Sequence, residues 1–109
     1  MAHSTFGPVQ LWDLRVTVQS VEGRPVCGLA AGDFFDVTHS SRLSLPPGGH
    51  FCIYALAAVL PLLPAHQRDL APDDWMSKDA LVACPDPEER LVMKVERLRR
   101  AEMDADELT

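Results

Sequence analysis

Positive charge is scarce in this sequence. Ten Lys and Arg residues stand against sixteen Asp and Glu residues, which gives a formal net charge of −6 at pH 7. Four of the basic residues lie close together, at Lys94, Arg97, Arg99 and Arg100. Binding to a nucleic-acid backbone needs a continuous basic face that releases counterions from the phosphates. We therefore expect no nucleic acid among the partners of this protein.

The sequence also lacks an apolar run long enough to cross a membrane. The longest uncharged stretch, residues 51–65, contains Pro61 and Pro64 and is shorter than the roughly 20 residues that a spanning helix needs. The first residues have neither the basic nor the apolar region of a secretory signal. We expect a cytoplasmic protein with no membrane contact.

Cysteine is too sparse for a disulfide framework. Cys27, Cys52 and Cys84 are an odd number spread along the chain, unlike the dense even sets of small secreted domains. No Cys-x-x-Cys or His-x-x-His pair is present, although structural zinc sites usually take a ligand pair from one tight turn. We expect reduced thiols and no metal. The alternative is that the three cysteines converge on a metal ion together with His50 or His39, because thiolate and imidazole suit zinc.

What is present is the composition of one folded domain. Apolar residues make up 47% and charged residues 24% of the 109 positions, close to the globular average. A second core would need roughly another hundred residues. We expect an N-terminal arm at residues 1–10, a single domain at residues 11–98 and an acidic tail at residues 99–109. The tail has little to bury, so it is predicted to be frayed or weakly helical.

Alternating apolar residues predict the strands. In residues 12–18 the side chains of Trp12, Leu14, Val16 and Val18 share one face, which indicates a half-buried strand. Three further strands are predicted at residues 34–37, 80–84 and 91–96. The last of these also suits one face of a helix, and we favour the strand. The Pro-Asp-Pro turn at residues 85–87 predicts a hairpin.

One helix is expected between these strands. Residues 40–49 are rich in Ser, Pro and Gly and predict a loop, and residues 67–78 predict an irregular connection. The helix should begin at His50 or Phe51 and end between Pro61 and Pro64. Its apolar side chains surround the axis, so we expect it to be buried on every side. The predicted fold is a small single α+β domain, with one buried helix packed on a mostly antiparallel sheet of about four strands.

The start of this helix is the main candidate site. Gly48 and Gly49 lead into His50 and Cys52, and a glycine loop that opens a helix places free backbone N–H groups and the positive helix end near the thiol. Cys52 would act as a nucleophile with His50 as acid or base, and the N–H groups would hold a small anionic ligand. Alternatively, Cys52 is a small buried residue and His50 is an ordinary loop residue.

Two more positions belong to the candidate site with less specific signals. Asp33 either assists Cys52 or caps the turn before a strand. Trp75 either closes over a ligand or pins its loop to the core, and the apolar indole favours pinning. No phosphate-binding or dinucleotide fingerprint is present, so no cofactor is expected. The candidate catalytic residues are Cys52, His50, Asp33 and Cys84, and the candidate ligand-binding residues are Gly48, Gly49 and Trp75.

The order of several short steps resembles a known family. Gly-Asp-x-Phe occurs at residues 32–35, Phe-Cys-x-x-Ala at 51–55, Cys-Pro-Asp at 84–86 and Lys-x-Glu-Arg at 94–97. From about Leu11 to Leu98 the chain resembles a family of short, uncharacterised prokaryotic proteins with three recurrent cysteines. The resemblance implies that Cys27, Cys52 and Cys84 are those cysteines and that Trp75 is the aromatic anchor. It implies no activity, and Pro87 and His50 depart from the family pattern.

Two classes of function remain open. The first, which we favour, is a small ligand- or partner-binding module, for instance an accessory subunit, with a protein partner or a second copy of the chain. It rests on the small core and on the lack of a specific catalytic constellation. The second is a small cyclase, isomerase or group-transfer enzyme of a bacterial biosynthetic pathway that uses Cys52 and His50. The two differ in whether the cysteines and His50 meet in one concave pocket.

Overall fold

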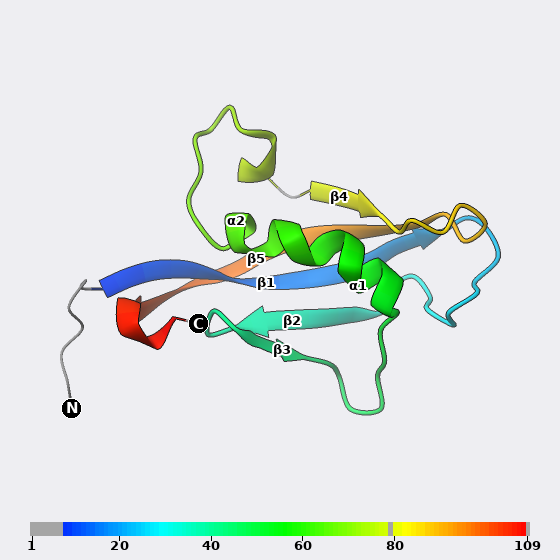
Figure 1. Cartoon of the computed structure of the whole chain (residues 1–109), viewed down its shortest axis with the longest axis horizontal. Helices are drawn as coiled ribbons and strands as arrows, with labels where there is room; N and C mark the ends of the chain where they lie inside the picture. Colours follow the sequence, from blue (N-terminus) through cyan, green and yellow to red (C-terminus); the bar gives the residue numbers. More distant parts are fainter. Residues whose placement is uncertain (1–7, 79, 109) are drawn as a thin grey trace.

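Five strands form one antiparallel sheet. The structure is a computed structural model that describes residues 8–78 and 80–108. The strand order is β3-β2-β1-β5-β4. Figure 1 shows the long strands β1 and β5 side by side through the middle of the molecule. The strands are β1 (Pro8–Val21), β2 (Phe34–Thr38), β3 (Arg42–Ser44), β4 (Ala80–Ala83) and β5 (Leu91–Asp104).

A short helical layer lies across one face of the sheet (Figure 1). It consists of α1 (Ile53–Val59), the 3-10 turn η1 (Leu60–Leu62) and α2 (Leu63–His66). Two further 3-10 turns are η2 (Trp75–Ser77) and η3 (Ala105–Glu107). Within residues 8–78 and 80–108, no helix has the length and apolar character needed to cross a membrane.

The core lies between this layer and the sheet. The central strands place alternating side chains there, since successive residues of a strand point to opposite faces. Phe35 of β2 meets Phe51 edge to face, with ring centroids 4.8 Å apart, and full burial of such a ring stabilises the fold by about 1.5–3 kcal/mol. The fully buried side chains from the strands are Leu14, Val16, Val18, Phe35, Leu91, Met93 and Val95.

On β5, Arg97 follows the core-facing residues Met93 and Val95 on the same face of the strand, but its side chain is charged. Its guanidinium donates hydrogen bonds to the carbonyl oxygens of His66 (2.8 Å), Ser77 (2.8 Å) and Met76 (2.9 Å). These acceptors belong to the end of α2 and to η2. A planar guanidinium with several donors suits such a set of carbonyls. Arg97 therefore fastens the irregular connection of residues 67–78 to the sheet.

The prediction of an α+β domain with an antiparallel sheet is confirmed, but the strand count is wrong. The extra strand is β3, which lies inside the predicted loop of residues 40–49. All its residues are exposed, so it has no alternation of buried and exposed side chains that sequence analysis could detect. It forms because a turn with left-handed residues, His39 (φ 51°) and Ser40 (φ 69°), returns the chain beside β2.

The prediction of a helix buried on every side is also wrong. Ala55 and Val59 are fully buried, whereas Ile53 is 70% and Tyr54 is 66% exposed. Leu56 is half-buried against the core. A single helical layer on one sheet contacts the sheet with one face only, and no second layer covers its outer face in the part of the chain that the structure describes.

The helical path does not end at the prolines. Pro61 lies in the first two positions of η1 and Pro64 in the first two positions of α2. At these positions of a helix the backbone N–H makes no intrahelical hydrogen bond, so proline, which lacks the N–H, does not disrupt the helix. The chain therefore restarts a short helix at each proline and continues to His66, beyond the predicted end.

Residues 99–104 of the predicted tail are instead strand, and residues 105–107 form the 3-10 turn η3. β5 continues to Asp104, which lies opposite Pro8, and Leu11 is buried where it pairs with Ala101. The strand signal of residues 99–104 is weak for two reasons. The register of the β1–β5 pairing shifts at Leu98, which interrupts the alternation, and this part of β5 carries charged residues. Residues 8–10 of the predicted N-terminal arm belong to β1, and residues 1–7 lie outside the described residues.

Candidate functional site

Two loops pack together at one end of the sheet. The connection between β1 and β2 meets the turn between β4 and β5, where Gly23 N donates to Glu89 O (3.0 Å) and Arg24 N donates to Glu88 O (3.0 Å). Arg24 and Glu88 also form an ion pair. A Cβ on Gly23 would lie 1.8 Å from Glu88 O, so only glycine permits this approach. The paired loops fix the backbone of Glu89.

The Glu89 side chain points inward from this turn. It is 1% exposed, and its Oε2 accepts hydrogen bonds from Cys27 N and from Cys27 Sγ, each at 3.0 Å. A buried carboxylate needs such donors to offset the loss of its hydration. Sequence analysis missed Glu89, because a glutamate in a charged turn looks like an ordinary solvated residue. Only its contacts reveal it.

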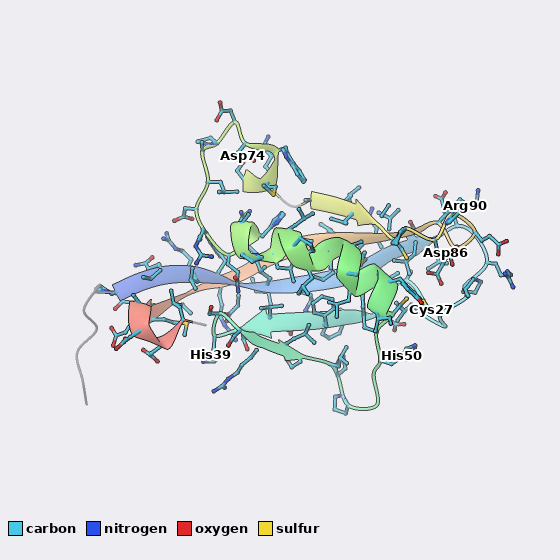
Figure 2. All side chains as sticks on the ribbon, in the orientation of Figure 1. Cys27, His39, His50, Asp74, Asp86 and Arg90 are labelled. Atoms are coloured by element: carbon cyan, nitrogen blue, oxygen red, sulfur yellow. The ribbon has the colours of Figure 1, made fainter. Side chains whose placement is uncertain are left out.

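Glu89 lines a small cavity that we call the thiol pocket. Its volume is about 180 Å³, and it is lined by the connection between β1 and β2, the start of α1 and the turn between β4 and β5. Figure 2 shows Cys27, His50 and Asp86 at the same end of the molecule, next to the start of α1. The residues that line the thiol pocket are Val26, Cys27, Cys52, Ile53, Tyr54, Cys84, Asp86 and Glu89. The structure therefore brings all three cysteines to one concave surface.

The environment of the thiol pocket keeps two of its thiols protonated. Burial, followed by the hydrogen bond to Glu89 and the interaction with the Cys52 thiol, raises the pKa of Cys27 to about 12, against an opposing hydrogen bond from Leu29. Burial is also the main cause that raises the pKa of Cys84, which the Asp86 backbone opposes. Cys27 and Cys84 are therefore poor nucleophiles unless a base removes their protons.

The raised pKa of Cys27 predicts a stability difference at alkaline pH. In the unfolded chain this thiol loses its proton near its ordinary pKa of 9.0, whereas the folded chain retains the proton up to about pH 12. Its contribution to the free energy of unfolding is thus complete below pH 9.0 and decreases as the pH rises through this window. The slope is at most about 1.4 kcal/mol per pH unit, less the effect of partial solvent exposure.

Urea unfolding of the parent and of Cys27→Ser, compared between about pH 8 and about pH 11, measures this effect. Serine keeps a donor for Glu89 but does not titrate in this range. The free energy of unfolding of the parent should fall more steeply with pH than that of Cys27→Ser. Equal slopes would contradict the placement of a protonated Cys27 against Glu89.

A second cavity holds four of the predicted site residues. Its volume is about 390 Å³, and its lining includes Asp33, Gly48, Gly49 and His50. Gly49 N donates to Pro46 O (2.8 Å), so this amide is already engaged. The Asp33 carboxylate accepts a hydrogen bond from Ala30 N and adds negative charge to the cavity. These contacts do not favour the anionic ligand expected for the glycine loop.

His50 adjoins the thiol pocket without forming the predicted pair with Cys52. Its Nε2 lies 3.1 Å from Cys27 O. A carbonyl only accepts, so Nε2 carries the proton of this hydrogen bond. Cys52 is the residue preceding α1, and its side chain makes no capping hydrogen bond. His50 therefore holds the backbone of Cys27 in place.

Trp75 does not behave as an anchor. It lies on η2 and is 61% exposed, so the prediction that the indole pins its loop to the core is wrong. It does not line the thiol pocket or the second cavity that contains Gly48 and Gly49. Asp74 fixes the start of η2 by accepting a hydrogen bond from Met76 N. The hydrogen bonds from Arg97 hold this loop, so burial of the indole is not needed.

Among residues 8–78 and 80–108, no group of three or more His, Cys, Asp or Glu side chains has an arrangement that could hold a metal ion. His39, one of the two histidines considered as a ligand, lies at the far end of β2 from His50 (Figure 2).

Comparison with protein-family models, curated proteins and solved structures finds no match to this chain. The resemblance to a family of short prokaryotic proteins stays a prediction.

Proposed function

We propose that this protein is a small binding module whose ligand occupies the thiol pocket. The observation that carries the proposal is the convergence of Cys27, Cys52 and Cys84 on one cavity that the buried Glu89 carboxylate also lines. A concave surface with apolar walls and a few fixed polar groups is the usual form of a small-molecule site. The volume of about 180 Å³ limits the bound group to a few heavy atoms.

The lining of the thiol pocket specifies the class of ligand. Val26, Ile53 and Tyr54 supply exposed apolar surface at its rim. Asp86 and Glu89 supply carboxylates, and the lining contains no Lys or Arg. An anion would be repelled by these groups and would find no counter-charge there. The ligand is therefore a small neutral or cationic molecule with an apolar part.

A pair of probes with the same carbon skeleton and opposite charge tests this proposal. We expect n-butylammonium to shift the backbone amide resonances of Cys27 and Glu89 in a saturable titration. We expect n-butyrate to leave them unchanged at the same concentration. The apolar rim holds the alkyl chain, and the carboxylates select the ammonium group.

Asp86→Asn supplies the matched variant for this titration. Its amide oxygen still accepts the hydrogen bond from Glu88 N, but its charge is lost. We expect it to weaken n-butylammonium binding about fivefold, the effect of one partly solvated charge pair. Asp73→Asn removes the same charge at an exposed position of the loop before η2 and should change nothing. Equal shifts with both probes, or shifts with neither, would contradict the proposal.

The alternative of an enzyme that uses Cys52 and His50 has less support. The imidazole hydrogen-bonds to a backbone carbonyl and not to a thiol. The group in contact with a cysteine sulfur is the Glu89 carboxylate.

A further inference from the structure

We propose that Cys27 and Cys52 are a redox-active pair that exchanges with small disulfides and closes a reversible disulfide bond in the thiol pocket. This activity does not depend on whether the pocket also binds a neutral or cationic ligand. The substrate class is a low-molecular-weight disulfide, and the reverse reaction consumes the corresponding thiol.

The positions of the two thiols support this proposal. Both line the thiol pocket, and the Cys52 thiol is close enough to Cys27 to contribute to the raised pKa of Cys27. Cys52 is partly exposed at the start of α1, so a disulfide from solvent can reach it. Cys27 is also partly exposed, and its Sγ lies 3.0 Å from Glu89 Oε2. Cys84 is 7% exposed at the end of β4 and is the least accessible of the three.

The first step occurs at Cys52. Its thiol loses a proton to solvent, and the thiolate attacks one sulfur of the small disulfide. A Cys52–ligand S–S bond forms, the S–S bond of the small disulfide breaks, and the released thiolate takes a proton from solvent. One thiol molecule has left, and Cys52 is held as a mixed disulfide.

The second step needs the proton of Cys27 to be removed. Glu89 Oε2 accepts this proton along the existing hydrogen bond, and the Cys27 sulfur attacks the Cys52 sulfur. The Cys27–Cys52 bond forms, the S–S bond between Cys52 and the ligand breaks, and the second ligand thiolate leaves. This thiolate takes the proton that Glu89 accepted, which restores the Glu89 carboxylate. In sum, two protein thiols are oxidised by two electrons and one small disulfide is reduced to two thiols.

Glutathione disulfide is the probe for the experiment. The full chain is incubated with it, remaining thiols are alkylated in acid-quenched samples, and peptide mapping identifies each cysteine. We expect Cys27 and Cys52 to be joined and Cys84 to be alkylated as a free thiol. Reduced glutathione should restore all three thiols.

Four variants test the two steps. Cys27→Ser should accumulate the mixed disulfide of Cys52 with glutathione, and Cys52→Ser should form neither product. Cys84→Ser leaves only Cys27 and Cys52 as thiols, and it should still form the disulfide between them. Glu89→Gln should form the mixed disulfide at the parental rate but close the internal bond about 100-fold more slowly, because the proton acceptor is lost. Circular dichroism shows which variants fold, and if Glu89→Gln does not, Cys27→Ser and Cys52→Ser decide the proposal.

Three results would overturn the proposal. They are a disulfide that includes Cys84, rapid mixed-disulfide formation in Cys52→Ser, and three freely alkylated cysteines after long exposure to glutathione disulfide. None of these results depends on n-butylammonium binding. If the disulfide forms but n-butylammonium does not bind, the proposal of a redox pair stands and only the proposed binding function is contradicted.

Discussion

Val59→Asp should unfold the protein at room temperature, whereas Ile53→Asp should change the free energy of unfolding by no more than about 0.5 kcal/mol. Both positions lie on α1, but Val59 is fully buried and Ile53 is 70% exposed. A carboxylate at Val59 would have no partner in an apolar core, which costs several kcal/mol against a total stability of about 5–15 kcal/mol.

Urea unfolding followed by circular dichroism measures both variants. The pair tests the position of α1, because a helix buried on every side would lose its fold with either substitution. Similar large losses at both positions would contradict the single helical layer. A folded Val59→Asp protein would show that α1 does not contribute to the core.

Gly23→Ala should lower the free energy of unfolding by about 3 kcal/mol and open the thiol pocket. The added Cβ would lie 1.8 Å from Glu88 O and 2.9 Å from Glu89 O, and both contacts are with backbone that cannot rotate away. The turn between β4 and β5 must move, and the Glu89 carboxylate moves with it. Cys27 then loses its hydrogen-bond acceptor and becomes more exposed to solvent.

Two measurements check this prediction. Urea unfolding gives the stability, and the rate of alkylation of Cys27 in the folded state, which should increase, gives the state of the pocket. Gly32→Ala is the control, because no atom lies within 4 Å of its added Cβ and its φ of 99° alone makes the substitution unfavourable. It should cost about 1–2 kcal/mol without a faster Cys27 reaction. An unchanged Cys27 rate in Gly23→Ala would contradict the role of the paired loops.

The candidate site shows where sequence analysis reached its limit. It selected Cys52 and Cys84, which line the thiol pocket, and Asp33, Gly48, Gly49 and His50, which line the neighbouring cavity. It considered Cys27 as a possible metal ligand and as one of three recurrent cysteines, but did not include it among the catalytic or ligand-binding residues. It paired Cys52 with His50 because they are close in sequence, although His50 hydrogen-bonds to the backbone of Cys27. Proximity along the chain says little about which polar groups meet across two loops.

The sequence by itself determined the strand character of β1, β2, β4 and β5 and the hairpin at residues 85–87. These features depend on alternation and turn chemistry within a few residues, so local sequence is sufficient. The tertiary structure alone decided which face of α1 is buried, that β5 continues to Asp104, and that Glu89 becomes a buried acceptor. Cys27 and Glu89 are separated by 62 positions. Their contact exists only because β1 and β5 pair along their length and bring both loops to the same end of the sheet.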